Sequence, residues 1–200
     1  MGAKYPAGPI ERIRNIFLAP RAEWPVIEAE ATSVRQLYIQ YVAPMAAFAA
    51  AMSFIRMSIV GVTPPWGGTI RTPVPSALMA SVVTFALGLL GLFLIGLIIN
   101  MLAPVFSGGR NQRQALKTAA YALTPAWLGT ALTFLPLGSV FQFLAGLYGI
   151  YVLYLGLPVM MGIPRAKADG YAVAVAVCTI LVGIMFGALG ATLGEVAQAH

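Results

Sequence analysis

Few side chains in this sequence are of the types that carry out catalysis or hold metal ions. His200 is the sole histidine and Cys178 the sole cysteine of the 200 residues, and the sequence contains no GxSxG, HExxH or P-loop motif. A histidine-ligated metal site, a Ser-His-Asp triad or an intrachain disulfide needs more of these groups than the chain has. We therefore predict that the protein is not an enzyme and binds no metal or other cofactor.

Polar uncharged side chains inside apolar segments are the next candidates for a site. Asn100 and Thr124 lie in two such segments, and Tyr148, Tyr151 and Tyr154 follow one another at three-residue steps in a third. These five side chains are predicted either to line a polar path across a membrane or to form hydrogen bonds between packed helices. We favour the second interpretation, because buried tyrosines usually pack with their hydroxyl groups satisfied.

Small residues at four-residue spacing give a packing signal. Gly183 with Gly187, and Gly190 with Gly194, form two GxxxG motifs, and Ala145 with Gly149 repeats the pattern in an earlier segment. Such ridges let helix backbones approach closely in lipid. The four glycines of the later segment are predicted to form the tightest helix seam, within one chain or between two, and replacing Gly187 by leucine is predicted to cost on the order of 1 to 3 kcal/mol.

The elements that carry these residues are membrane-spanning helices. The chain is 60% hydrophobic and only 9% charged, with a mean hydropathy of +0.85, whereas soluble domains have about 25% charged residues. Apolar stretches long enough to cross a hydrocarbon layer of about 30 Å predict five helices, and the turn at 136–138 makes the third and fourth antiparallel neighbours. Their predicted ranges are 34–60, 76–103, 117–135, 139–162 and 171–193.

The first 36 residues are predicted to form a cytoplasmic segment ahead of a five-helix domain at 37–195. Ile10, Ile13, Phe17 and Leu18 recur at helical spacing, which indicates a short amphipathic helix at the membrane surface. We expect Pro20 to end this helix. A turn is expected at Trp24-Pro25, with the indole at the headgroups, and Ser33 with Gln36 has the spacing of a capping box at the start of the first spanning helix.

The basic residues predict the orientation of the chain. With the N-terminus in the cytoplasm, ten Lys and Arg residues fall on the cytoplasmic side and only Arg56 and Arg71 near the outer side. Because Lys and Arg resist translocation, this imbalance predicts a protein of the inner (plasma) membrane with its C-terminus outside. The net charge of +6 is then a sign of topology rather than of nucleic-acid binding. Residues predicted to contact acidic lipid or a protein partner are Arg12, Arg14, Arg110, Arg113 and Lys117.

Several segments, in order, resemble prokaryotic members of the Yip (Ypt-interacting protein) family. They are Ile10–Pro20 with Glu23-Trp24-Pro25, Leu37-Tyr38 with Tyr41 to Pro44, Leu102–Pro104 through Asn111 to Lys117 with Tyr121 to Trp127, and Leu147-Tyr148-Gly149 through Tyr154 to Pro158. The resemblance implies the five-span topology. Eukaryotic members of that family associate with Rab GTPases in membrane traffic. Here their Asp-Leu-Tyr-Gly-Pro signature is matched only by Leu37-Tyr38 and a displaced Pro44, and the Ala- and Gly-rich composition is typical of a bacterial protein.

The predicted function is that of a membrane-organising or scaffold protein whose partners are membrane lipid and other membrane proteins or a second copy of itself. One alternative is a small permease or channel for an uncharged or anionic solute. Another is an accessory subunit of a larger membrane complex. A polar cavity open to both faces would favour the permease, and a dry packed bundle would favour the scaffold or subunit.

Overall fold

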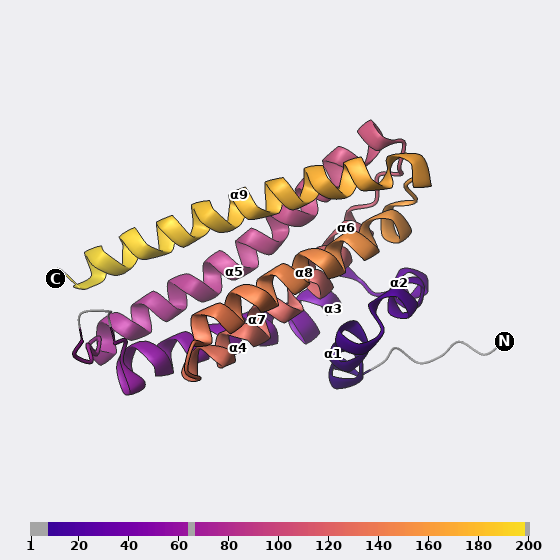
Figure 1. The fold of residues 1–200 in the computed structure, drawn as a ribbon. Coiled ribbons are helices and arrows are strands. Elements are labelled where there is room, and N and C mark those ends of the chain that lie inside the picture. Colours follow the sequence, from indigo (N-terminus) through magenta and orange to yellow (C-terminus); the bar gives the residue numbers. More distant parts are fainter. Residues whose placement is uncertain (1–7, 64–66, 199–200) are drawn as a thin grey trace.

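The computed structural model describes residues 8–63 and 67–198, which form a bundle of helices (Figure 1). No strand occurs in this part of the chain, where Val62 and Ile70 form one isolated bridge. The predicted all-helical class is confirmed. The elements are α1 (Pro9–Leu18), α2 (Pro20–Ala29), α3 (Val34–Leu37), η1 (Tyr38–Val42), α4 (Ala43–Phe54), η2 (Ile55–Val60), α5 (Val74–Leu102), η3 (Ala103–Phe106), α6 (Gln112–Ala122), α7 (Thr124–Gly129), η4 (Thr130–Phe134), α8 (Gly138–Met161) and α9 (Arg165–Gln198).

Four helices of the described part are long and apolar enough to cross a membrane. They comprise Val34–Val60, Val74–Phe106, Gly138–Met161 and Arg165–Gly190, close to the predicted first, second, fourth and fifth spans. Large apolar side chains on their outer faces are exposed, among them Phe143, Leu181 and Ile184. Such a surface is compatible with lipid rather than water as the surrounding solvent.

The segment that contains the predicted third span is not one continuous helix. It consists of α6, α7 and η4, with a break at Leu123 just before Pro125. The proline explains the break, because its ring nitrogen has no hydrogen to donate to the preceding turn. No piece is long enough to span a membrane alone, so the described chain has four qualifying helices where five were predicted.

The first spanning helix begins at the predicted capping box. The Ser33 hydroxyl accepts from the Gln36 backbone N–H at 3.2 Å, and the Ser33 N–H donates to the Gln36 side chain at 3.1 Å. The π-helical turn η1 then directly precedes Pro44, which lies in the first turn of α4. A wider turn at this place accommodates the missing N–H of the proline within a helix that continues to Val60.

The N-terminal segment folds back on the bundle as two helices, α1 and α2, which we call the N-terminal cap (residues 9–30). Pro20 follows the end of α1 as predicted, but it also begins α2, a position where its fixed φ suits a helix. The predicted turn at Trp24-Pro25 is wrong, because both residues lie inside α2. Figure 1 shows the cap at one end of the bundle and the C-terminal end of α9 at the other.

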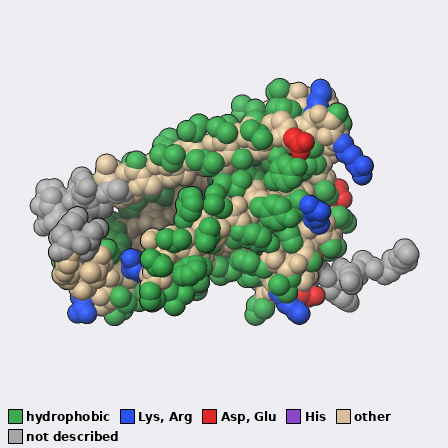
Figure 2. Space-filling view, viewed as in Figure 1, with side chains coloured by type: hydrophobic (Ala, Val, Ile, Leu, Met, Phe, Trp, Pro, Cys, Tyr) green, Lys and Arg blue, Asp and Glu red, His purple; other side chains and the backbone are tan. Residues whose placement is uncertain are grey.

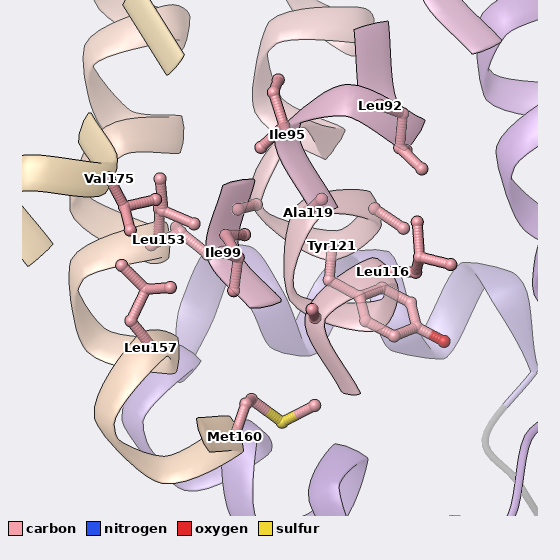
Figure 3. Close-up of a cluster of buried hydrophobic side chains, with 14 of the residues drawn as sticks. Leu92, Ile95, Ile99, Leu116, Ala119, Tyr121, Leu153, Leu157, Met160 and Val175 are labelled. Carbon is pink, nitrogen blue, oxygen red and sulfur yellow. The ribbon is translucent and has the colours of Figure 1, made fainter. Parts of the chain in front are cut away.

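The hydrophobic core lies between α5, α6, α8 and α9. Leu92, Ile95 and Ile99 of α5 pack with Leu153 of α8 and Val175 of α9, all of them buried (Figure 3). The α6 residues Leu116, Ala119 and Tyr121 cover the side of this cluster that faces the first spanning helix. The core therefore ties the interrupted segment to the long helices around it.

Candidate functional site

The most polar part of the interior is where the N-terminal cap meets the bundle, and Arg12 of α1 is its centre. Its guanidinium group is almost fully buried, with 2% of the side chain exposed, and forms ion pairs with Glu23 of α2 and with Glu30, the residue that ends α2. The Arg12 Cζ atom also lies 5.6 Å from the centroid of the Tyr121 ring of α6. Two carboxylates and an aromatic face thus compensate the charge removed from water.

Side chains of α6 form hydrogen bonds with backbone carbonyl groups at the C-terminal end of α2. Gln114 Nε2 donates to the Glu28 carbonyl oxygen at 2.9 Å, and Lys117 Nζ donates to the Glu30 carbonyl oxygen at 2.8 Å. Gln114 and Lys117 are three residues apart, so they share one face of α6. The Glu28 carbonyl is one of those that a helix C-terminus leaves unpaired, whereas the Glu30 carbonyl also accepts from the Thr32 N–H at 3.0 Å. The Lys117 charge suits the negative end of the helix dipole.

Lys117 itself is fully buried at this junction and lies outside the four helices long enough to span a membrane. Burial lowers the pKa of its ammonium group to about 8, while the charge of Glu30 acts in the opposite direction. The lysine is therefore held by the cap rather than presented to the surroundings.

Helix α8 holds the other side of the cap through Trp24. The indole is fully buried, and its Nε1–H donates to the Val152 carbonyl oxygen at 3.2 Å. Gly156, one turn further along α8, lies directly against the indole ring, where any side chain would overlap it. At the end of α1, the Tyr148 hydroxyl donates to the Phe17 carbonyl oxygen at 2.9 Å and the two rings stack at 5.7 Å.

Behind Arg12, two tyrosines connect the first spanning helix to α6 and α7. The Tyr41 hydroxyl and Thr124 Oγ1 are hydrogen-bonded at 2.7 Å, and the Tyr41 and Tyr121 rings meet edge to face with centroids 4.7 Å apart. Thr124 also donates to the Ala120 carbonyl oxygen at 3.2 Å, across the break before α7. The site therefore joins the cap, the first spanning helix, the interrupted segment and α8.

The family to which this arrangement belongs follows from comparison with known proteins. The Yip1 domain matches residues 14–187, which include most of the cap and all the junction residues described above except Arg12. The chain belongs to the Yip1 domain family. No curated protein and no solved structure matches it. The family and the apolar helices together make it a multi-pass membrane protein of the Yip type.

The five basic residues predicted to contact lipid or a partner fall into two groups in this Yip1 domain. Arg14, Arg110 and Arg113 are exposed, as contact with an outside surface requires. Arg12 and Lys117 are buried in the cap junction, so for them the prediction is wrong. The reason is that the cap supplies its own carboxylates and carbonyl groups to both cations.

The four residues of the predicted apolar face of α1 do not share one environment. Ile10 and Leu18 are exposed, whereas Ile13 packs against the core and the Phe17 ring stacks on Tyr148. The expectation that the Trp24 indole lies at the headgroups is wrong, since the indole is fully buried against Gly156 of α8. Trp66, which the sequence predicts as an interfacial anchor, and His200, predicted to face outward with the C-terminus, lie outside the described residues.

The five side chains of the predicted polar path are dispersed through the Yip1 domain. Thr124 bonds to Tyr41, Tyr148 to the cap, and Tyr154 to Asp169 of α9 at 2.7 Å. Tyr151 is exposed, and the Asn100 side-chain oxygen is buried with no partner in the described chain. The Tyr148 and Tyr151 rings meet with centroids 5.8 Å apart, but none of the five residues lines the apolar cavities at Ile95, at Gly187 or at Phe54.

The glycine ridge of α9 is not a close seam within the chain. A Cβ atom at Gly183 or Gly187 would have no neighbour within 4 Å, and one at Gly190 would lie 3.8 Å from Leu87. Gly194 continues the ridge within α9. The prediction of the tightest intrachain seam here is wrong, because α5 and α9 are separated by a cavity at Gly183, Gly187 and Gly190.

The close seam is instead at Ala145 and Gly149 of α8, the other small-residue motif. A Cβ atom at Gly149 would lie 2.8 Å from the Ala122 carbonyl oxygen, and one at Gly129 would lie 2.7 Å from the Ala145 Cβ atom. Both contacts join α8 to the interrupted segment. Because α6 ends at Ala122 and α7 begins at Thr124, the break itself lies against this seam.

Several residues of the junction were not predicted from the sequence as site residues, namely Glu23, Glu30, Trp24, Gln114 and Tyr41. One signal was present for the carboxylates. Glu23 and Glu30 are seven residues apart, which places them on one side of a helix and its immediate continuation. That Arg12 would meet them depended on the reversal of the chain between α1 and α2.

Proposed function

We propose that this Yip1 domain protein is a non-enzymatic scaffold of the cytoplasmic membrane that contacts acidic lipid or acidic protein surfaces through the end of the bundle that carries the cap. The observation that carries this proposal is the grouping of exposed cations at that end, where Figure 2 shows Lys and Arg side chains gathered. These exposed residues are Arg14, Arg21, Arg35, Arg110, Arg113, Arg165 and Lys167. None of them forms an ion pair within the described chain, so their charge is available to an outside anion.

The proposal includes five membrane crossings, with the cap end in the cytoplasm and the C-terminus outside. The position of the C-terminal end of α9 opposite the cap supports an odd number of crossings (Figure 1). The missing crossing would be made by α7 and η4 with the apolar end of α6. Breaks in this segment are tolerable in a membrane because α4 and α8 flank it and Arg56 donates a hydrogen bond to the Thr133 carbonyl oxygen of η4.

The orientation predicts different labelling of two engineered cysteines. In a Cys178→Ser background, Arg71→Cys should react with a membrane-impermeant maleimide in intact cells, and Arg110→Cys should react only after the cells are opened. Both parent side chains are exposed, so accessibility to the reagent differs only by the side of the membrane. Labelling of Arg110→Cys alone in intact cells would reverse the proposed orientation.

The proposed contact with acidic lipid predicts a loss of retained lipid on removal of two charges. Each basic residue near an anionic surface contributes about 1 kcal/mol, so Arg110→Gln combined with Arg113→Gln should weaken retention of acidic phospholipid roughly 30-fold. The measurement is native mass spectrometry of protein released from bilayers that contain equal amounts of acidic and zwitterionic lipid. Arg71→Gln, at the opposite end, serves as the matched control and should retain lipid like the parent. If the parent shows no preference for acidic lipid, the lipid part of the proposal fails.

A further inference from the structure

The bundle contains an apolar cleft between α8 and α9 that none of its own side chains fills. A cavity of about 440 Å³ lies between α5, the interrupted segment, α8 and α9, and a second of about 430 Å³ continues along α5 and α9. Ile95, Leu123 and Thr179 line both, so the two cavities adjoin, and we call the pair the α8–α9 cleft. Figure 2 shows the surface hollowed below α9, toward the end away from the cap.

The lining of the α8–α9 cleft is predominantly apolar. Its threonine hydroxyls are used within their own helices, Thr179 donating to the Val175 carbonyl oxygen at 2.8 Å and Thr84 to the Ala80 carbonyl oxygen at 2.9 Å. No charged side chain lines either cavity. The space exists because the walls carry glycine, and a Cβ atom at Gly146 or Gly183 would meet no atom within 4 Å.

The cleft is closed at the cap end and open toward the bilayer. Next to the cap, the hydrogen bond from Tyr154 to Asp169 joins α8 to α9. Farther along, Phe143 and Leu147 of α8 and Ile180 of α9 line the cleft and are also exposed on the outside of the bundle. The mouth of the cleft is thus continuous with the apolar surface that a membrane protein presents to lipid.

We propose that the α8–α9 cleft holds one hydrocarbon chain of a bilayer lipid. The size of each cavity lies within the range of roughly 300 to 1,000 Å³ typical of small-ligand sites, whereas a second helix is about 10 to 12 Å wide with its side chains. A flexible chain with no hydrogen-bonding group matches both the lining and the surroundings. Its terminal methyl group lies toward the closed end of the cleft, near Leu153, and its polar head lies at the membrane surface away from the cap. The inference rests on the membrane location, and it does not depend on the proposed contacts of the basic end.

Trp127 provides a direct test, because it lines the cleft and is largely buried by protein. In bilayers whose lipids carry bromine near the middle of the chain, the emission that distinguishes the parent from Trp127→Phe should be quenched by at least half. Filling both walls with Gly146→Leu and Gly183→Leu should abolish that quenching. Ala188→Leu, on an exposed part of α9 outside the cleft lining, is the matched control and should leave the quenching unchanged.

The same samples decide against the proposal in two ways. Equal quenching in the parent and in the filled variant would show that bromine reaches Trp127 without entering the cleft. Absence of quenching in the parent, with a doubled mass by size measurement in detergent, would assign the cleft to a second copy of the chain. Native mass spectrometry gives an independent readout, since the parent should retain a neutral lipid under conditions in which the filled variant loses it, and retention by both would also overturn the assignment.

Discussion

Replacing Arg12 by methionine is expected to weaken the docking of the N-terminal cap onto the bundle by about 3 to 5 kcal/mol, the usual cost of removing one partner from a buried ion pair. Glu23 is 7% exposed and would keep a carboxylate in a site from which its counter-charge has gone. Methionine preserves much of the side-chain volume, so the effect is that of charge rather than of an empty space. The measurement is hydrogen exchange of the cap amides in the purified protein, which reports local opening.

Two variants control this result. Arg14→Met removes an exposed arginine of the same helix and should change the exchange by less than about 0.5 kcal/mol. Adding Glu23→Gln and Glu30→Gln to Arg12→Met removes the uncompensated charges and should restore most of the docking free energy. If Arg12→Met and Arg14→Met behave alike, the ion pairs do not hold the cap. The fluorescence of Trp24, which docking buries, gives a second readout of cap release.

Replacing Gly149 by alanine is expected to lower the free energy of unfolding by about 1 to 3 kcal/mol, as for other cases of overpacking. The added methyl group would lie 2.8 Å from the Ala122 carbonyl oxygen, and a backbone atom cannot move aside as a flexible side chain does. The matched variant Gly187→Ala meets no atom within 4 Å and should gain up to about 1 kcal/mol from the better helix propensity of alanine.

This pair of variants replaces the sequence-based prediction that Gly187 is the sensitive position. The measurement is thermal unfolding of each purified variant in detergent, with its oligomeric mass. Equal melting temperatures for Gly149→Ala and the parent would contradict the seam on α8. A large loss in Gly187→Ala together with a smaller oligomeric mass would place the α9 ridge between two copies of the chain.

The interrupted segment of α6, α7 and η4 shows which structural features the amino-acid pattern can predict and which it cannot. Pro125 predicts a break because its consequence is local: the ring removes one donor from the turn before it. What the break is for does not follow from the proline. The structure places the end of α6 against Gly149, and Lys117 and Gln114 on the carbonyl groups of α2, so the segment serves as a connector between α8 and the cap.

The sequence by itself determined the features that depend on neighbouring residues along the chain. Hydropathy and length predicted the all-helical membrane class and five spans, four of which are long helices in the structure, and Ser33 with Gln36 predicted a capping box that the structure confirms. The order of the segments that resemble Yip proteins also led to the correct family. Each of these rests on spacing within one turn or one span, where the partner groups are fixed by helix geometry.

Only the tertiary structure decided which helices meet and which charges are buried. Two GxxxG ridges and one small-residue pair look alike in sequence, because a spanning helix is apolar toward both lipid and protein, so its pattern does not say which face packs. Arg12 and Arg14 are the same residue type on the same helix, yet Arg12 is buried in ion pairs with Glu23 and Glu30, whereas Arg14 is exposed. That difference arises from the reversal of the chain between α1 and α2, which brings carboxylates eleven and eighteen residues away onto a single guanidinium group.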